Sequence, residues 1–282
     1  MNQAKDFTTR SGLIVKVCLV FVFVSQALTA QDLYDLKNSR EFSGYLMQSG
    51  QFSLAVPEFR RVLFFCPDDS LARINLLIAL RRSGDPAGAL DQLKTWFGTE
   101  PPRSFAIEGI KSSIMDQRFD LASDLLESAP DIPETEQAYY RMGLGLLTWS
   151  GDENTLPEEG RDPSPGYAKL LDVRTQASQM KMKSPALALA MSAVIPGLGK
   201  VYSKDWKDGL FSLMFIGGNV LQAYRGFSKF GTGNPYGWIF GTLAVGFYGA
   251  NLYGSWKSAA DFNRRQLEYI QDETGKLLHS RF

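Results

Sequence analysis

Three residue types recur in this chain at a spacing of 34 residues. The pairs are Gly50 and Gly84, Ala55 and Ala89, and Pro67 and Pro101. Glycine permits a tight turn, alanine lets two helices approach closely, and proline blocks the continuation of a helix. A fixed period of this length is typical of helix-turn-helix units that stack on one another. The sequence therefore predicts a helical repeat.

The apolar residues between these landmarks have the spacing of one helical face. Phe52, Ala55 and Phe59 lie at positions i, i+3 and i+7 after the first glycine. A third and looser copy begins at Gln117, 33 residues after the second glycine. One pair of helices cannot cover its own apolar face, so neighbouring pairs are expected to stack around a shared core.

The pattern resembles the tetratricopeptide-repeat family over residues 36 to 149, with a terminal helix after the third copy. The tryptophan and the Leu-Gly pair that are usual in the first helix of that family are missing from the first two copies. The resemblance implies a concave surface that binds a peptide or a partner helix. The large aromatic residues are expected in the core, and solvated surface charge is the simpler explanation for the arginines. The residues predicted to contact a partner are Tyr45, Arg60 and Arg81.

Two uncharged, glycine-rich apolar segments follow, at residues 209–224 and 237–256. About 20 helical residues span about 30 Å, which is the thickness of a bilayer core. Trp238, Tyr253 and Trp256 lie near the ends of the second segment, where interfacial aromatic residues are common. The sequence therefore predicts a transmembrane helical hairpin.

Small residues recur at intervals of four in the second segment. They are expected to let membrane helices pack closely, and they offer a face for a homo-oligomer. The predicted packing residues are Gly237, Gly241, Gly246, Ala250 and Gly254.

A third apolar segment, residues 185–199, is short, because 15 helical residues reach only about 22 Å. It is either a third crossing or an interfacial or re-entrant helix. With only two crossings, the lysines between Lys200 and Lys207 remain outside the cytoplasm with the repeats, against the positive-inside tendency. The sequence leaves two and three crossings open.

A short motif begins inside this third segment and ends at the start of the hairpin. Its residues are Pro196, Gly197, Gly199, Tyr202 and Gly209. The motif resembles a family of small bacterial membrane modules, the two-transmembrane-helix domain family, and domains of unknown function that follow helical repeats in envelope proteins. Lys200 stands where glutamine is common in that pattern, which puts a shared polar role at this position in doubt. The resemblance implies an envelope location and brings no particular reaction.

The N-terminus has the order of a secretory signal. Lys5, Arg10 and Lys16 precede an apolar run at residues 17–24, and small residues lead to an expected cleavage after Ala30. An uncleaved signal anchor is the alternative, and either form exports the domain that follows. Cys18 lies in a poor match to a lipoprotein box. Its removal leaves Cys66 as the one cysteine, so no internal disulfide is expected.

The predicted fold class is all-α, with a short helical-repeat solenoid, a transmembrane hairpin and a third short membrane helix as an option. The predicted domains are a signal peptide at 1–30, repeats at 31–150, an exposed linker at 151–166, and a membrane module with a basic tail at 167–282.

These patterns favour a scaffold in the bacterial envelope, with the repeats in the periplasm and the module in the inner membrane. Equal numbers of basic and acidic residues, 30 each, do not favour a nucleic-acid partner. No catalytic motif, metal-ligand set or cofactor-binding motif is found, so no enzyme activity is expected. The alternative is a small transporter or channel subunit in which Asn219, Gln222 and Asn251 line a polar path.

Overall fold

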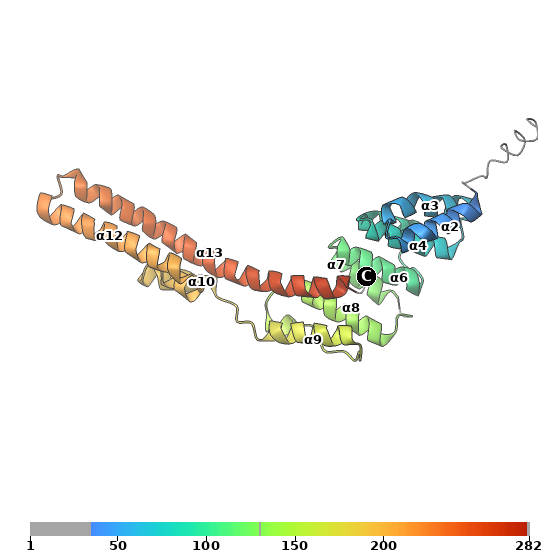
Figure 1. Ribbon diagram of the computed structural model, residues 1–282. Coiled ribbons are helices and arrows are strands. Elements are labelled where there is room, and N and C mark those ends of the chain that lie inside the picture. The colour runs from blue at the N-terminus through green and yellow to red at the C-terminus, as the bar shows by residue number, and fades with distance from the viewer. Residues whose placement is uncertain (1–34, 130, 281–282) are drawn as a thin grey trace, which may run out of the picture. The chain divides into compact units, whose positions relative to one another are not determined.

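The computed structural model describes residues 35–129 and 131–280, and all regular secondary structure in that part of the chain is helical (Figure 1). The prediction of an all-α fold is confirmed. The predicted signal peptide and Cys18 lie outside the described residues. The chain forms two compact units that divide between Gly98 and Thr99. The domain boundaries predicted from the sequence stay predictions.

The described part of the first unit, residues 35–98, contains two pairs of helices. They are α2 (Leu36–Gln48), α3 (Phe52–Phe65), α4 (Ser70–Arg82) and α5 (Pro86–Phe97). The chain turns within each pair at Gly50 and Gly84, whose φ angles are 73° and 90°. Glycine adopts this left-handed conformation without the steric cost of a side chain. Ala55 and Ala89 are buried, so both landmarks of the 34-residue period have a structural reason.

Aspartate side chains begin the second pair of helices. Asp69 accepts a hydrogen bond from the Ala72 amide at 3.0 Å, and Asp85 accepts one from the Gly88 amide at 2.9 Å. Arg40 on α2 donates to Asp69 at 2.6 Å and joins the two pairs. The Ala72 amide is the main reason why the pKa of Asp69 lies below its usual value, and Arg40 lowers that pKa further while burial opposes both.

The second unit begins with a third pair of helices and continues to the C-terminus. Its elements are α6 (Arg103–Met115), α7 (Phe119–Glu127), α8 (Glu134–Leu147), the 3₁₀ helix η1 (Glu153–Thr155), α9 (Pro165–Ser178), α10 (Pro185–Val194), α11 (Leu198–Tyr202), α12 (Trp206–Phe230) and α13 (Pro235–His279). The turn between α6 and α7 contains Gln117 with a φ angle of 58°, where the earlier pairs have glycine. Ala122 is fully buried, so the looser third copy has the same design.

The segment predicted to be an exposed linker, residues 151–166, is held against α9. The Arg174 side chain donates to the carbonyl oxygen of Pro157 at 2.7 Å. The Tyr167 hydroxyl donates to the carbonyl oxygen of Gly160 at 3.1 Å and accepts from its amide at 2.6 Å. These hydrogen bonds satisfy backbone groups of a proline-rich segment that forms no long helix. The segment is therefore part of the second unit's packing.

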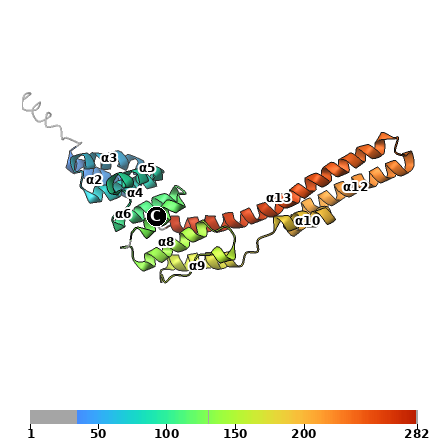
Figure 2. The same cartoon turned by 180° about the vertical axis from the view of Figure 1, so that it is seen from behind.

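The last helix, α13, is 45 residues long and serves two parts of the second unit. Its first part packs beside α12, α10 and α11, and its last part packs against α8 and α9, as the two opposite views in Figures 1 and 2 show. At about 1.5 Å per residue it extends for about 67 Å. The predicted basic tail is therefore helical as far as His279.

The helices of the structure do not support the expected transmembrane hairpin. Within residues 35–129 and 131–280, no helix combines enough length with enough apolar character to qualify as a membrane span. The glycines and the polar residues Asn219, Gln222 and Asn251 lower the mean hydropathy of the two segments. The third segment is also not one helix, because the chain leaves α10 at Ile195 and starts α11 after Gly197.

Candidate functional site

Four helices of the second unit, α10 to α13, form a compact module around the predicted Pro-Gly-x-Gly motif. Gly197 has a φ angle of 88°, and a Cβ atom placed on it would clash with the carbonyl oxygen of Gly209. A Cβ atom on Gly209 would in turn lie 2.7 Å from the carbonyl oxygen of Gly197. The two motif glycines therefore allow the turn before α11 to touch the first turn of α12.

Gly199 brings a second pair of backbones together. A Cβ atom on Gly199 would clash with the carbonyl oxygen of Ala188 on α10. The Gly199 amide donates to the Ser192 hydroxyl at 2.8 Å, and that hydroxyl lies 2.6 Å from the hydroxyl of Ser255 on α13. Both serines are fully buried. They connect α10, α11 and α13 through one small polar cluster.

Asn251 on α13 completes this cluster. Its side-chain oxygen accepts a hydrogen bond from the Gly197 amide at 3.0 Å, and the residue is 3% exposed. A second asparagine, Asn263, accepts from the Lys183 amide at 2.7 Å and donates to the Lys183 carbonyl oxygen at 2.8 Å. The hydroxyl of the motif residue Tyr202 accepts from the Ser184 amide at 3.2 Å. The two asparagines fix turns of the module to α13, and Tyr202 connects α11 to the start of α10.

The predicted packing residues of α13 have different surroundings. A Cβ atom on Gly237 would lie 2.7 Å from the Phe227 ring, and one on Gly254 would lie 3.1 Å from the side chain of Lys200. Gly241 has ordinary contact, Gly246 has open space, and Ala250 is exposed. Close packing thus occurs at two of the five positions.

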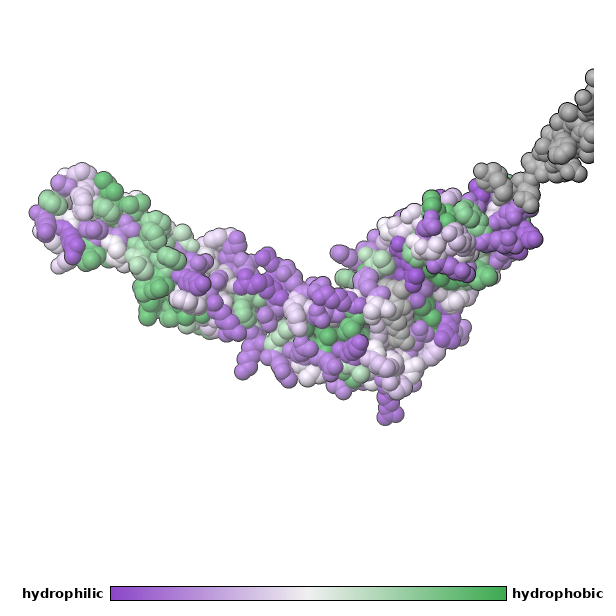
Figure 3. Space-filling view, viewed as in Figure 1, coloured by the Kyte–Doolittle hydropathy of each residue, from purple (hydrophilic) through white to green (hydrophobic). Residues whose placement is uncertain are grey.

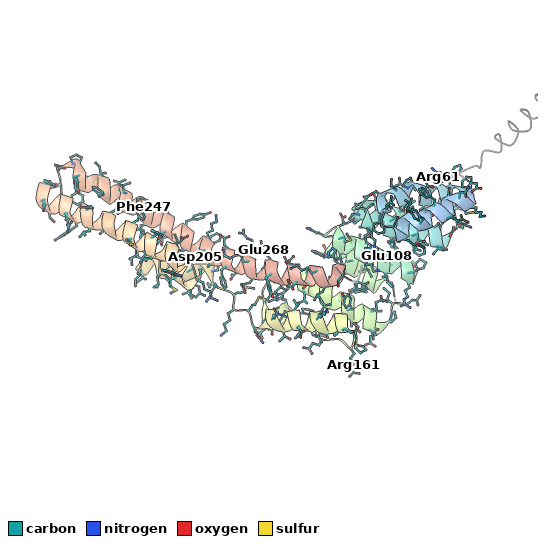
Figure 4. The ribbon with its side chains drawn as sticks, in the orientation of Figure 1. Arg61, Glu108, Arg161, Asp205, Phe247 and Glu268 are labelled. Atoms are coloured by element: carbon teal, nitrogen blue, oxygen red, sulfur yellow. The ribbon has the colours of Figure 1, made fainter. Side chains whose placement is uncertain are left out.

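Large apolar side chains cover much of the outer surface of the module. They are exposed on α10, on α12 and on the first half of α13, where Figure 3 shows hydrophobic surface and Figure 4 labels Phe247. No charged residue occurs between Tyr236 and Trp256. The second half of α13 carries charged residues, among them Glu268 (Figure 4). The apolar surface is therefore confined to one half of the helix.

A cavity of about 230 Å³ opens beside this surface between α11, α12 and α13. Its polar lining includes Lys200, Asp208 and Ser212, and its apolar lining includes Phe215 and Phe247. The Lys200 ammonium donates to the Ser212 hydroxyl at 3.0 Å. The two phenylalanine rings are 5.8 Å apart at their centroids. The cavity thus has a charged end and an aromatic end.

The three amides of the predicted polar path have separate partners. The Asn219 side chain donates to the carbonyl oxygen of Phe215 on its own helix at 2.7 Å. The Gln222 side chain accepts from the Tyr236 hydroxyl at 3.4 Å. Asn251 is engaged with Gly197, as described above. The structure therefore supplies no shared hydrogen-bonded path among them.

The residues predicted to contact a partner lie in the first unit. Tyr45 is 59% exposed and stacks on the exposed ring of Phe42 at a centroid distance of 6.4 Å. Arg60 is exposed on α3. Arg81 is 2% exposed on α4, so it is not available on an open surface, contrary to the expectation. Arg81 lies in the last turn of α4, and its charge alone did not indicate that it is buried.

The sequence did not indicate the roles of the buried Ser192 and Ser255, or the contact of the Lys200 side chain with Ser212. In a sequence, a serine whose hydroxyl is needed in the core cannot be told from a serine that an apolar helix merely tolerates. In the structure, Ser192 and Ser255 are buried together with Asn251.

Among the described residues, no three His, Cys, Asp or Glu side chains are grouped so that they would hold a metal ion.

Comparison with known proteins adds no relative: no family model, no curated protein and no solved structure matches the chain.

Proposed function

We propose that this protein is a membrane-anchored scaffold of the bacterial envelope, with a tetratricopeptide-like region that binds a protein or peptide partner. The observation that carries the proposal is the apolar outer surface of the α10–α13 module. Large exposed apolar patches are unfavourable in water and mark contact with a lipid or a partner. The uncharged stretch of α13 between Tyr236 and Trp256 matches the thickness of a bilayer core at about 30 Å.

Charged residues border the apolar surface at both ends of the hairpin. Lys204 and Lys207 precede or begin α12, and Arg225 and Lys229 lie near its other end. This arrangement favours a hairpin whose middle lies in lipid and whose ends reach the two headgroup regions. Helix α10, at 10 residues, extends for about 15 Å, so the proposal has two crossings. In this proposal the predicted N-terminal secretory signal puts the repeats in the periplasm, on the same side as Lys204 and Lys207.

Three charges on the exposed surface of the hairpin are expected to remove the protein from lipid vesicles. The variant replaces Met214, Leu221 and Val245 with glutamate, and all three wild-type side chains are exposed. Each charge costs about 3 kcal/mol at the centre of a membrane helix, so the bound fraction should fall more than tenfold. Flotation of the full-length protein with phosphatidylcholine vesicles measures this fraction.

The matched control changes three exposed apolar residues of the first unit, Leu54, Phe64 and Leu71, to glutamate. Its flotation should equal that of the wild type. If the hairpin variant also floats like the wild type, another part of the chain holds the protein at the membrane and the proposed anchor is wrong.

The partner-binding half of the proposal rests on the exposed aromatic pair of α2. Stacked aromatic residues supply large contact area with few rotatable bonds, which suits them to anchoring a partner. A photo-crosslinking residue at position 45, in place of Tyr45, should form one discrete adduct in intact cells. The same residue in place of the exposed Lys94 on α5 should not. Equal labelling at both positions would remove Tyr45 from the binding surface.

A further inference from the structure

The side chain of Lys200 extends across the α10–α13 module and contacts two other helices. It starts on α11, passes Gly254 on α13, and hydrogen-bonds to Ser212 on α12 at 3.0 Å. A Cβ atom on Gly254 would lie 3.1 Å from Cε and 3.4 Å from Nζ of this lysine. The glycine therefore provides the space along which the lysine reaches the cavity.

The lysine ammonium retains binding capacity at this position. An ammonium group has three N–H donors. Among the described residues, Ser212 is the polar group that accepts from it, and no ion pair is formed. A half-buried cation beside exposed apolar side chains is unfavourable unless an anion accompanies it. The Ser212 hydroxyl donates its own proton to the carbonyl oxygen of Asp208 at 2.9 Å. The cavity therefore favours an anionic group next to the Lys200 ammonium.

The cavity lining changes along α12 from polar to apolar. Asp208 and Ser212 lie nearer the charged end of the hairpin, and Phe215 lies one turn further toward its loop. Phe247 on α13 faces Phe215 at 5.8 Å between ring centroids. This order of a charged end followed by an aromatic groove matches a phospholipid, in which a headgroup is joined to acyl chains.

The second charged residue narrows the choice of headgroup. Asp208 lines the same cavity as Lys200 and is exposed, so an acidic residue as well as a basic one borders the charged end. A headgroup that carries both a phosphate and a primary ammonium is complementary to this pair, because each charge meets its opposite. A headgroup with a phosphate alone would place its negative charge beside an uncompensated Asp208.

We propose that the cavity between α11, α12 and α13 binds one phosphatidylethanolamine molecule. The lipid phosphate contacts Lys200, the lipid ammonium contacts Asp208, and an acyl chain lies against Phe215 and Phe247. The proposal rests on the proposed location of the hairpin in a membrane. It adds a lipid that is held specifically, beside the lipids that contact the apolar surface in general.

The experiment measures which lipid stays with the protein. Full-length protein is reconstituted in vesicles of equal parts phosphatidylethanolamine, phosphatidylglycerol and phosphatidylcholine. It is then repurified in mild detergent, and the retained lipids are quantified by mass spectrometry. Wild-type protein should retain phosphatidylethanolamine at least fivefold over the other two lipids.

Two variants and one control separate the contributions. Lys200→Met should lose most of the retained phosphatidylethanolamine, whereas Lys169→Met, at an exposed lysine of α9 outside the cavity lining, should retain the wild-type amount. Asp208→Asn keeps the size of the side chain and should shift the preference toward phosphatidylglycerol. Thermal unfolding monitored by circular dichroism checks that each variant is folded.

The outcomes distinguish this proposal from the proposed function. Retention of all three lipids in equal amounts, or equal retention by Lys200→Met and wild type, overturns the lipid site while flotation still supports the anchor. A wild-type preference for phosphatidylglycerol overturns the proposed contact between Asp208 and the lipid ammonium. A wild-type protein that does not float with phosphatidylcholine vesicles overturns the anchor and the lipid site together.

Discussion

Replacing Gly199 with alanine is expected to disrupt the α10–α13 module and to lower the free energy of unfolding by about 3 kcal/mol. The added Cβ atom would clash with the carbonyl oxygen of Ala188, which belongs to the backbone of α10 and cannot rotate away. Any shift of α10 would also break the hydrogen bond of 2.8 Å from the Gly199 amide to Ser192. For a unit of this size, we expect the midpoint of thermal unfolding to fall by about 6–12 °C.

Gly246→Ala is the matched control for this variant. Gly246 lies within α13, and a Cβ atom on it would have no neighbour within 4 Å. Alanine is favoured over glycine in a helix by up to about 1 kcal/mol, so the unfolding temperature should stay the same or rise slightly. Circular dichroism of detergent-purified protein measures both variants. Similar unfolding temperatures for the two variants would mean that α10 and α11 do not approach each other as described.

The helical pairs were predictable because their signals are local. Gly50 and Gly84 occupy left-handed turns, and Ala55 and Ala89 are buried, as the 34-residue spacing indicated. The third pair was harder to recognise because Gln117 adopts the left-handed conformation in place of glycine, with a φ angle of 58°. That conformation has a steric cost for glutamine, and composition alone did not predict it.

The motif near Pro196 was recognisable in the sequence, but its physical reason was not. Gly197 is required by its contact with Gly209, and Gly199 is required by its contact with Ala188. Each partner lies about one helix length away in the sequence. Ser192 and Ser255 form their contact across 63 positions. Because no local periodicity encodes such contacts, these two serines were not identified as members of the site.

The extent of α13 shows a different limit of sequence reasoning. The apolar stretch ends at Trp256 and charged residues begin at Lys257, which suggested a tail after a membrane helix. The structure continues as one helix to His279. A change from apolar to charged composition alters the environment of a helix but does not end it, and no proline occurs in this stretch.

The continuous helix gives the module a fixed connection to α8 and α9. Tyr139 on α8 donates a hydrogen bond from its hydroxyl to the carbonyl oxygen of Leu277 at 3.2 Å. Gln271 donates to the carbonyl oxygen of Leu147 at 3.1 Å. Within the second unit, a displacement at the apolar half of α13 is therefore transmitted to α8 through helical backbone and not through a flexible linker.

Leu278→Ala is expected to loosen this connection and to lower the free energy of unfolding by about 3 kcal/mol. Leu278 is fully buried, and its side chain occupies the space that the absent side chain of Gly143 leaves on α8. Removal of the leucine leaves a cavity at this contact. The thermal midpoint of the second unit should fall by about 6–12 °C.

Gly143→Ala tests the same contact from the other side. In the wild-type background its Cβ atom would lie 2.7 Å from the Leu278 side chain, so the substitution should lower stability by about 1 kcal/mol. In the Leu278→Ala background the new methyl group meets the cavity instead, and alanine also favours the helix. The same substitution should then raise stability. The reversal of sign identifies direct contact, because substitutions at independent sites have additive effects. If Gly143→Ala lowers stability equally in both backgrounds, the end of α13 does not pack on α8 at this residue.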